Sequence, residues 1–437
     1  MTALRVATCS APTNIATIKY WGKDSTALNT PLNSSVSVTL HQDDLRTKTT
    51  IAASPAFATT HLWLNGKEQS INARVQAVLR EMKALAHKQH GEQALHSWHL
   101  RIVSENSFPT AAGLASSAAG YACLVATLAE LYKVKDESPG QLSSIARQGS
   151  GSACRSLDGG FVRWQKGVNA DGSDSLAVRV ADEHHWPALR AIICVVNDRE
   201  KDTSSTSGMK TSKETSTLLQ HRVASVVDGR LEQIEAAYQA RDFATFGELT
   251  MRDSNQFHAV CLDTYPPIFY MNEVSRKIIH IVHRFNTFHG AVRAAYTFDA
   301  GPNAVIFLED KDVAAVLALL QTYFPTTRDG GSLPIQTVSS ASELHQWRNA
   351  SFPADLRAMT QVSPSPGGIK SLYVTRVGGG TRVLATNESL VDLTTGKPRI
   401  PRVEKTKEEP APSPSRGPLA VLTALVGMFT LLSVARR

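Results

Sequence analysis

The sequence FPTAAGLASSAAG, residues Phe108–Gly120, joins a β-like run at Trp98–Ser104 to a long apolar run at Tyr121–Tyr132. Small residues with a proline and glycines at this place predict a strand that turns sharply into a helix. The first backbone N–H groups of such a helix have no partner within it, and the helix dipole places partial positive charge there. The stretch therefore predicts an anion site, and phosphate is the ligand that fits it best.

Two hydroxyl groups strengthen this prediction. Ser116 and Ser117 can contact phosphate oxygens or a magnesium ion, and Gly113 lets the backbone approach a ligand closely. The stretch lacks the Gly-Lys-Ser/Thr ending of a P-loop and the three-glycine spacing of a dinucleotide fold, so both of those motifs are excluded. A turn without a ligand remains the alternative for the loop taken alone.

Composition sets wide bounds on the protein class. A chain of 437 residues with 42% hydrophobic and 19% charged residues predicts two globular domains or one large one. The net charge of +7 suits an anionic substrate but would also suit weak nucleic-acid binding. Five scattered cysteines argue against a disulfide framework and a zinc site, and favour a reducing compartment. Residues Met1–Ser10 lack the pattern of a secretory signal, so we expect a cytosolic protein.

A second motif crowds two lysines and two aromatic rings around a glycine, in the sequence Lys19-Tyr20-Trp21-Gly22-Lys23. Lysines alone would usually be solvated at the surface, and that remains the alternative. Tyrosine and tryptophan are commonly half-buried with one polar group in use. Lysines held beside them can meet phosphate as compact charges, so the motif indicates a second anion site.

A third motif is the glycine- and serine-rich run Gly149–Ser156, GSGSACRS. Its backbone N–H groups and hydroxyls can converge on an anion, and its glycines allow positive φ. A flexible loop is the alternative, but such a loop does not explain the arginine within it. Arg155 is suited to bidentate binding of a planar carboxylate.

A single carboxylate, Asp299, stands between two β-like runs in Asp-Ala-Gly-Pro-Asn. Such an aspartate usually caps its own turn. His258, in a predicted helix, is expected to be a packed and hydrogen-bonded histidine rather than a catalyst. Arg74 opens a predicted helix at Asn72–His87 and would ordinarily be an exposed arginine.

Spacing of apolar residues predicts the remaining elements. The expected strands are Arg5–Ala16 with a turn at Pro12, Pro31–Leu40, Thr47–Ala53, His61–Leu64, Ala191–Val196 and Ile369–Arg376. The expected helices are one after Ala118 that is buried nearly all round, and Leu142–Gln148, Leu218–Arg241, Phe243–Cys261, Met271–Gly290 and Val313–Tyr323. Lys201–Met209 is expected to be a polar loop, and Leu356–Ser363 has no clear pattern.

The motifs together resemble a known family. The first loop resembles the Pro-x-x-x-Gly-Leu-x-Ser-Ser-Ala signature of the GHMP kinase superfamily, and Ala115 in place of glycine resembles its diphosphomevalonate decarboxylase branch. The Lys-Tyr-Trp-Gly-Lys and Gly-Ser-Gly-Ser-Ala-Cys-Arg-Ser runs are similar to that family as well. The resemblance covers residues 5–395 and implies an α+β, two-domain GHMP-kinase fold. It implies a ribosomal-protein-like N-terminal half and a ferredoxin-like C-terminal half, with the active site in the cleft between them. The expected domains are 1–190, 191–397, and a linker and tail at 398–437.

The resemblance also implies roles for single residues. Asp299 would be the catalytic carboxylate with Lys19 beside it, and Arg155 would hold the substrate carboxylate. The residues expected to bind the substrate are Tyr20, Trp21, Gly22, Lys23, Arg74, Ser150, Gly151, Ser152, Ala153, Cys154, Arg155 and Thr206. The residues expected to bind the nucleotide are Pro109, Ala112, Gly113, Leu114, Ala115, Ser116 and Ser117, and Ser117 would also meet magnesium. The sequence departs from the family at Asp24, where an arginine is usual, which removes one positive charge near the diphosphate.

The function implied by the resemblance is conversion of (R)-5-diphosphomevalonate and ATP, with Mg²⁺, to isopentenyl diphosphate, ADP, phosphate and carbon dioxide on the route to isoprenoids and sterols. A homodimer that binds no nucleic acid is also implied. One alternative is a GHMP kinase that phosphorylates a mevalonate derivative without decarboxylation. Another is a non-catalytic protein that uses its basic surface to bind RNA.

The C-terminal end has a different composition. Arg402–Arg416 is charged and rich in proline and serine, as linkers are. Leu419–Ala435 is uncharged and largely apolar, and its length is near the lower limit of roughly 17 residues for spanning a bilayer. A membrane anchor or membrane-surface segment is one expectation, and a disordered or processed end is the alternative.

Cell fractionation without detergent distinguishes the two expectations for this tail. A membrane anchor predicts that the full-length chain sediments partly with membranes and that the chain without residues 398–437 stays in the supernatant. The physical reason is that burial of each apolar side chain in lipid is favourable. A disordered or processed end predicts that both stay in the supernatant. Full-length protein found only in the supernatant would exclude the anchor.

Overall fold

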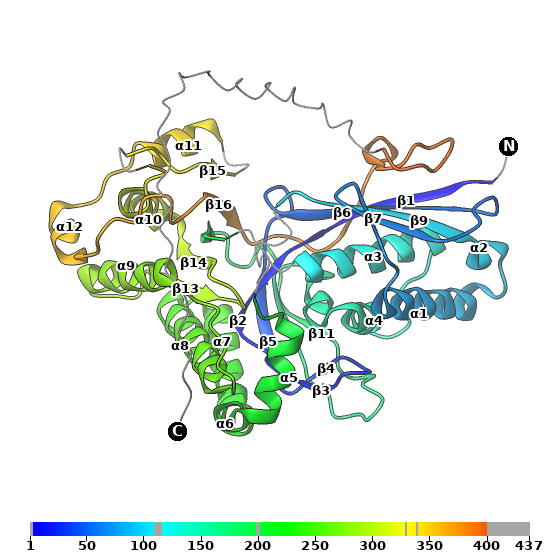
Figure 1. The fold of residues 1–437 in the computed structure, drawn as a ribbon, viewed down its shortest axis with the longest axis horizontal. Coiled ribbons are helices and arrows are strands. Elements are labelled where there is room, and N and C mark those ends of the chain that lie inside the picture. Colours follow the sequence, from blue (N-terminus) through cyan, green and yellow to red (C-terminus); the bar gives the residue numbers. More distant parts are fainter. Residues whose placement is uncertain (1–2, 109–115, 198–201, 328–329, 338–339, 400–437) are drawn as a thin grey trace, which may run out of the picture. The chain divides into compact units, whose positions relative to one another are not determined.

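The computed structural model describes residues 3–108, 116–197, 202–327, 330–337 and 340–399. Within these ranges the strands form three sheets and one short strand pair. Neighbouring strands are antiparallel except for β7 with β9 and β15 with β16. The fold is α+β, with two halves that each combine sheets and helices (Figure 1).

The first sheet belongs to the N-terminal half. Its strand order is β17 (Arg382–Val383), β1 (Arg5–Pro12), β6 (Arg46–Ser54), β9 (His99–Asn106), β7 (His61–Leu64) and β8 (Lys67–Gln69). One face of this sheet is covered by helices, and the helices of this half are α1 (Ala73–His90), α2 (Ala94–Ser97), α3 (Ser116–Tyr132) and α4 (Gln141–Gly149) (Figure 1). Helix α3 packs on β1 and β6 and is buried over most of its surface, as its apolar sequence predicts.

The second sheet lies between the two halves. Its order is β11 (Ala177–Ala181), β10 (Phe161–Trp164), β5 (Ser35–Thr39) and β2 (Asn14–Ile18). Apolar residues of β2 and β5, such as Ile15 and Val38, belong to the same core cluster as the strands of the C-terminal half. The core is therefore continuous across the two halves, and this continuity fixes their relative position. A strand pair, β3 (Lys23–Ser25) with β4 (Thr30–Pro31), extends from β2.

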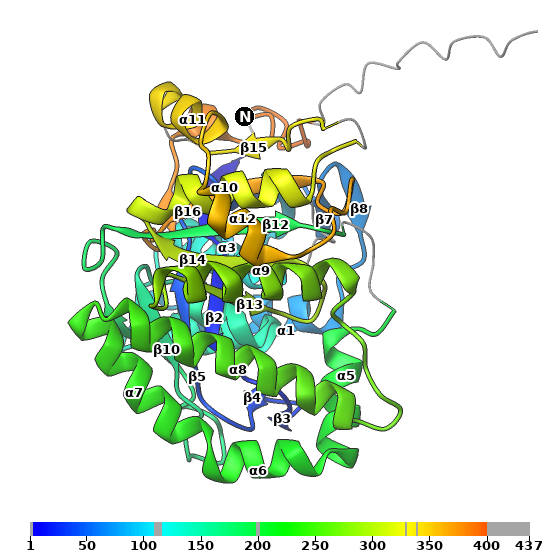
Figure 2. The same ribbon diagram turned by 90° about the vertical axis from the view of Figure 1, so that its left-hand side faces the viewer.

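The third sheet forms the centre of the C-terminal half. Its order is β13 (Ala294–Phe298), β14 (Ala304–Glu309), β12 (Leu189–Val195), β16 (Ser371–Arg376) and β15 (Ile335–Gln336). The helices of this half are α5 (Ser205–Thr215), α6 (Thr217–Ser225), α7 (Val227–Ala240), α8 (Phe243–Asp263), α9 (Glu273–His289), α10 (Asp310–Tyr323), α11 (Ala341–Arg348) and α12 (Ala354–Thr360). Figure 2 shows α8 and α9 crossing in front of this sheet, and α8 packs directly on β13.

The chain returns to the N-terminal half at its end. Strand β17 pairs with β1, and Leu390 and Val391 pack in a cluster with Ala52 and Val103 of the first sheet. The C-terminal half is thus inserted between two parts of the N-terminal half. The division into 1–190 and 191–397 stays a prediction, and the pairing of β17 places the last part of the second range on the first half. Sequence patterns do not report this pairing because it joins residues far apart in the chain.

Most predicted elements agree with the structure to within a few residues, including the strand at His61–Leu64 and the helix that begins after Asn72. The Asn72 side chain accepts hydrogen bonds from the backbone N–H groups of Arg74 and Val75, which caps α1. Two predictions were wrong. The expected loop at Lys201–Met209 contains the start of α5, and the expected single helix at Leu218–Arg241 is two helices, α6 and α7.

Among the residues that the structure describes, no helix is long and apolar enough to cross a membrane. The tail segment at 419–435 lies outside the described residues. All five cysteines are buried and form no disulfide.

Candidate functional site

A cavity of about 640 Å³ opens between the two halves and is lined by both of them. Among its described lining residues, four side chains are cationic and one is a carboxylate. They are Lys19, Lys23, Arg74 and Arg155, and Asp299. An excess of positive charge in a partly enclosed space favours a polyanionic ligand, because enclosure strengthens each interaction relative to water.

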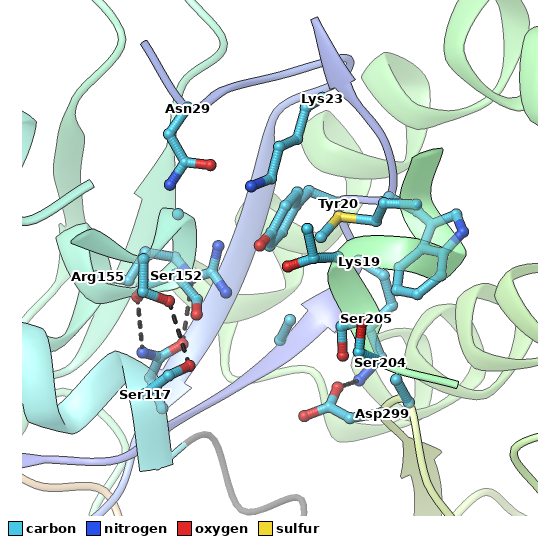
Figure 3. A pocket seen from close by; sticks show the side chains of 18 of the residues that line it. Lys19, Tyr20, Lys23, Asn29, Ser117, Ser152, Arg155, Ser204, Ser205 and Asp299 are labelled. Atoms are coloured by element: carbon cyan, nitrogen blue, oxygen red, sulfur yellow. Dashed lines mark hydrogen bonds and ion pairs between the residues drawn. The ribbon is translucent and has the colours of Figure 1, made fainter. Parts of the chain in front are cut away.

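The carboxylate is held by a lysine from the other half of the protein. Lys19 follows β2, and Asp299 follows β13. The Lys19 Nζ atom lies 2.6 Å from Asp299 Oδ1, and the side chains are 4% and 35% exposed. Asp299 therefore keeps an open side toward the cavity, where it can accept a proton from a hydroxyl group (Figure 3).

Arg155 is buried opposite this pair and is held by neutral groups. Its Nε donates to Asn14 Oδ1 and Ser37 Oγ, at 3.2 and 3.0 Å, and its Nη1 donates to Ser35 Oγ at 2.6 Å. Burial lowers the pKa of the Arg155 guanidinium, although the group stays protonated at neutral pH. In the described part of the chain, no carboxylate forms an ion pair with Arg155, so its charge is available to an anionic ligand.

The GSGSACRS run forms a short 3₁₀ helix, η1 (Gly151–Ser156). Side chains three residues apart share one face of such a helix, which explains why Ser152 and Arg155 both line the cavity. Ala153 and Cys154, which were also predicted to contact substrate, are buried away from the cavity. Burial raises the pKa of the Cys154 thiol to about 12, and its Sγ donates to the carbonyl of Gly151.

Four of the five residues of the Lys-Tyr-Trp-Gly-Lys motif line the cavity. Tyr20 and Trp21 both line the cavity. Burial raises the pKa of Tyr20 to about 12, so its phenol is neutral at pH 7. Trp21 donates from Nε1 to Ser212 Oγ of α5 at 2.9 Å, so its indole also joins the two halves. Gly22 is absent from the cavity wall, and its φ of 89° explains the need for glycine there.

Lys23, Arg74 and Thr206 lie together on the cavity wall. Arg74 Nη2 donates to Thr206 Oγ1 at 3.3 Å, which links α1 to the first turn of α5. Burial, with a contribution from Arg74, lowers the pKa of Lys23 to about 8. Asp24, the departure from the family pattern, is exposed and is not part of the cavity wall.

The predicted phosphate loop is only partly described. Pro109, Ala112, Gly113, Leu114 and Ala115 lie outside the described residues. Ser116 and Ser117 begin α3 and line the cavity together with Ser150. Ser117 Oγ lies 3.3 Å from Ser150 Oγ. Figure 3 shows Ser117, Ser152 and Arg155 on one side of the cavity, with Lys19 and Asp299 on the other.

Family models match both halves of the chain. A model described as "Diphosphomevalonate decarboxylase-like N-terminal domain" matches residues 11–177, and one described as "Mevalonate 5-diphosphate decarboxylase C-terminal domain" matches residues 191–384. The diphosphomevalonate decarboxylase of Homo sapiens is 50% identical over 388 residues, which cover 87% of this chain and 94% of the human protein. The chain belongs to the diphosphomevalonate decarboxylase family.

Solved structures of this decarboxylase family resemble the fold as well. The mevalonate diphosphate decarboxylase from Trypanosoma brucei has a TM-score of 0.81 and 37% sequence identity, with 89% of this chain and all of that chain covered. The protein called MDDEF, in complex with MVAPP, AMPPCP and magnesium, has a TM-score of 0.65 and 31% identity, with 88% and 100% covered.

The cavity residues of this chain are suited to binding a nucleotide together with Mg²⁺. The N-terminal end of α3 presents two serine hydroxyls to a cavity with excess positive charge, which suits phosphate oxygens. The described residues include no cluster of three or more histidine, cysteine or acidic side chains that could hold a metal alone.

Several lining residues escaped the sequence analysis, among them Asn14, Asn29, Ser204, Ser205, Met209 and Phe257. Asn14 donates to Ser156 Oγ at 2.8 Å and accepts from Arg155, so it orients the arginine. An asparagine inside a strand is unusual, and that was the available signal. Ser204 caps α5 by accepting from Ser207 N–H, which its Ser-Ser-Thr-Ser sequence could have indicated.

His258 of this decarboxylase-family chain is packed beside the site rather than in it. It is 4% exposed, contacts Phe257 and Phe298, and does not line the cavity. Burial, reinforced by nearby Lys19, lowers its pKa to about 4. His258 is therefore neutral at pH 7, which agrees with the prediction that it is a packed histidine.

Proposed function

We propose that this chain catalyses the ATP-dependent decarboxylation of (R)-5-diphosphomevalonate to isopentenyl diphosphate, with release of ADP, phosphate and carbon dioxide. Family membership supports the reaction class. The observation that carries the proposal is the Lys19–Asp299 pair, which faces a cavity that also holds Arg155. This arrangement provides a proton acceptor for a hydroxyl group and a separate cation for a carboxylate.

We propose that Asp299 orients the tertiary 3-hydroxyl group of the substrate and accepts its proton during phosphoryl transfer. The hydroxyl oxygen forms a bond to the γ-phosphorus of ATP, and ADP leaves. Lys19 holds the Asp299 carboxylate in place, because its Nζ atom lies 2.6 Å from Asp299 Oδ1. Positioning and charge neutralisation are the main contributions that proteins make to phosphoryl transfer.

The decarboxylation step depends on the opposite wall of the cavity. Phosphate leaves the tertiary carbon with the electron pair of the C–O bond, and positive charge develops on that carbon. The electron pair of the carboxylate C–C bond then forms the new double bond, and carbon dioxide departs. We assign to Arg155 the binding of the carboxylate, because Asn14, Ser35 and Ser37 hold its guanidinium in a fixed direction.

The two phosphorylated ligands are assigned to different parts of the cavity. Lys23, Arg74, Ser152 and Thr206, with the phenol of Tyr20, would hold the diphosphate of the substrate. Ser116 and Ser117 at the start of α3 would contact the ATP phosphates and their Mg²⁺, which neutralises the charge of the transferred group. We also propose that the enzyme acts in the cytosol as a homodimer and that its 419–435 segment contacts membranes.

One assay separates this reaction from its alternatives. With purified full-length chain, ATP, Mg²⁺ and (R)-5-diphosphomevalonate, we expect one carbon dioxide for each ADP formed. A kinase would form ADP and a phosphorylated acid without carbon dioxide. A non-catalytic protein would form neither, and either of these results would overturn the proposal.

The role of Asp299 is tested by Asp299→Asn, which keeps the side chain's shape but removes its charge. We expect turnover to fall by at least about 100-fold, the lower range for loss of a general base. ATP affinity, measured by calorimetry, should change less than about twofold. Asp171→Asn, on an exposed loop, is the matched control and should keep full turnover. Near-normal turnover of Asp299→Asn would refute the assignment.

The lowered pKa of Lys23 predicts pH-dependent substrate binding. Below about pH 8 the ammonium is charged and attracts diphosphate, and above that pH the free protein loses this charge. We therefore expect KM for the substrate to rise from pH 7.5 to 9.5, by up to about tenfold per pH unit above the pKa. Lys23→Arg should flatten this rise, because arginine stays charged. A flat KM in the unmodified enzyme would contradict the prediction.

A further inference from the structure

The main chain of Lys19 is held by side chains of the opposite half. Lys19 is the first residue after β2. Its N–H donates to Asp253 Oδ2 of α8 at 2.7 Å, and its carbonyl accepts from Arg222 Nη2 of α6 at 2.8 Å. Charged side chains of the opposite half therefore bind both backbone groups where the strand ends, and Asn33 Nδ2 of the same half also donates to the carbonyl at 3.0 Å.

These two side chains form a fully buried ion pair. Arg222 Nη1 and Nη2 donate to Asp253 Oδ1 and Oδ2 at 2.7 and 2.9 Å, and both side chains have zero exposure. Arg230 of α7 adds a third donor to Asp253 at 3.0 Å. Burial of charges is costly, and a buried ion pair often stabilises a fold no better than apolar residues would. A gain in stability therefore does not by itself account for a charged cluster at this place.

The next residue of α8 binds the main chain of Phe298, which directly precedes Asp299. Ser254 Oγ accepts from the backbone N–H of Phe298 at 3.0 Å. Ser254 is 1% exposed. One helical turn later, the ring of His258 packs on the ring of Phe298, with the ring centroids 6.1 Å apart. Consecutive residues of one helix therefore bind the main chain of Lys19 and that of the residue beside Asp299.

We propose that Asp253 and Ser254 are positioning residues that set the separation of Lys19 and Asp299. The inference rests on the proposed function, because it concerns the same carboxylate. Lys19 comes from the N-terminal half and Asp299 from the C-terminal half. Their contact at 2.6 Å therefore requires an element that binds the main chain near both residues. Helix α8 supplies it, with Arg222 and Arg230 balancing the charge of Asp253. Neither positioning residue lines the cavity.

The test uses Asp253→Asn and Ser254→Ala with two matched controls. Asp312→Asn removes the charge of another buried aspartate, which is bound by Arg293 and lies away from the cavity. Ser143→Ala removes another buried helical serine, whose Oγ accepts from the backbone N–H of Ala177 at 3.0 Å. The controls reproduce the structural cost of each substitution without a contact to Lys19 or Phe298.

We expect kcat to fall by about 10- to 100-fold in Asp253→Asn and Ser254→Ala, because small displacements of catalytic groups cost up to about 100-fold. KM for ATP and for substrate should stay within about threefold. The controls should lower the melting temperature to a similar degree, but their kcat should stay within about twofold of the unmodified enzyme. If Asp253→Asn does not fold, Ser254→Ala alone decides the outcome.

Double variants distinguish a loss of positioning at Asp299 from a general loss of rigidity in the protein. Because Ser254 acts through Asp299, Ser254→Ala should add less than about twofold to the loss in Asp299→Asn, measured as single-turnover ADP formation. Losses that multiply would overturn the inference, and so would folded single variants with kcat equal to their controls. An unmodified enzyme without turnover would instead refute the proposed function, so the two failures are distinguishable.

Discussion

The candidate active site depends on one short contact, between Lys19 Nζ and Asp299 Oδ1. The two residues are 280 positions apart in the chain and belong to different halves. An electrostatic attraction weakens with distance, and much faster once water enters between the charges. The contact therefore requires that the halves keep a fixed relation. The continuous core through β2 and β5, and the bond from Trp21 to Ser212, supply that relation.

The chemistry of the cavity follows from how its charges are partnered. Lys19 is committed to the only described carboxylate on the cavity wall, whereas Arg155 is held by neutral oxygen atoms. A cation held by neutral groups keeps its full attraction for an incoming anion. One wall thus carries a carboxylate that can accept a proton, and the other carries a guanidinium that can bind an anion. The proposed phosphoryl transfer and the proposed elimination need one of these groups each.

Sequence analysis succeeded where the information is local. A cap such as Asn72 and the alternation of β5 are set by neighbouring residues, and motifs such as GSGSACRS are continuous in the chain. Features that depend on contacts between residues far apart in the chain were predicted less well. The sequence predicts a loop at the start of α5 because its residues are small and polar. The Ser204 cap is a local signal for the helix, and the Trp21–Ser212 bond and packing on α8 add contacts from distant residues. The contributions of Asn14 and Asp253 were missed because their partners lie far away in sequence.

The inserted topology also determines where the chain connects the two halves. The chain passes from one half to the other between β11 and β12, and again between β16 and β17. These crossings are adjacent, because Arg190 pairs with Arg376 and the N–H of Gly160 donates to the carbonyl of Gly378 at 2.9 Å. A Cβ atom on Gly378 would lie 2.5 Å from the Cα of His41, so the backbones there touch. The two connections between the halves therefore run side by side, with their backbones in contact, and do not lie at separate places in the fold.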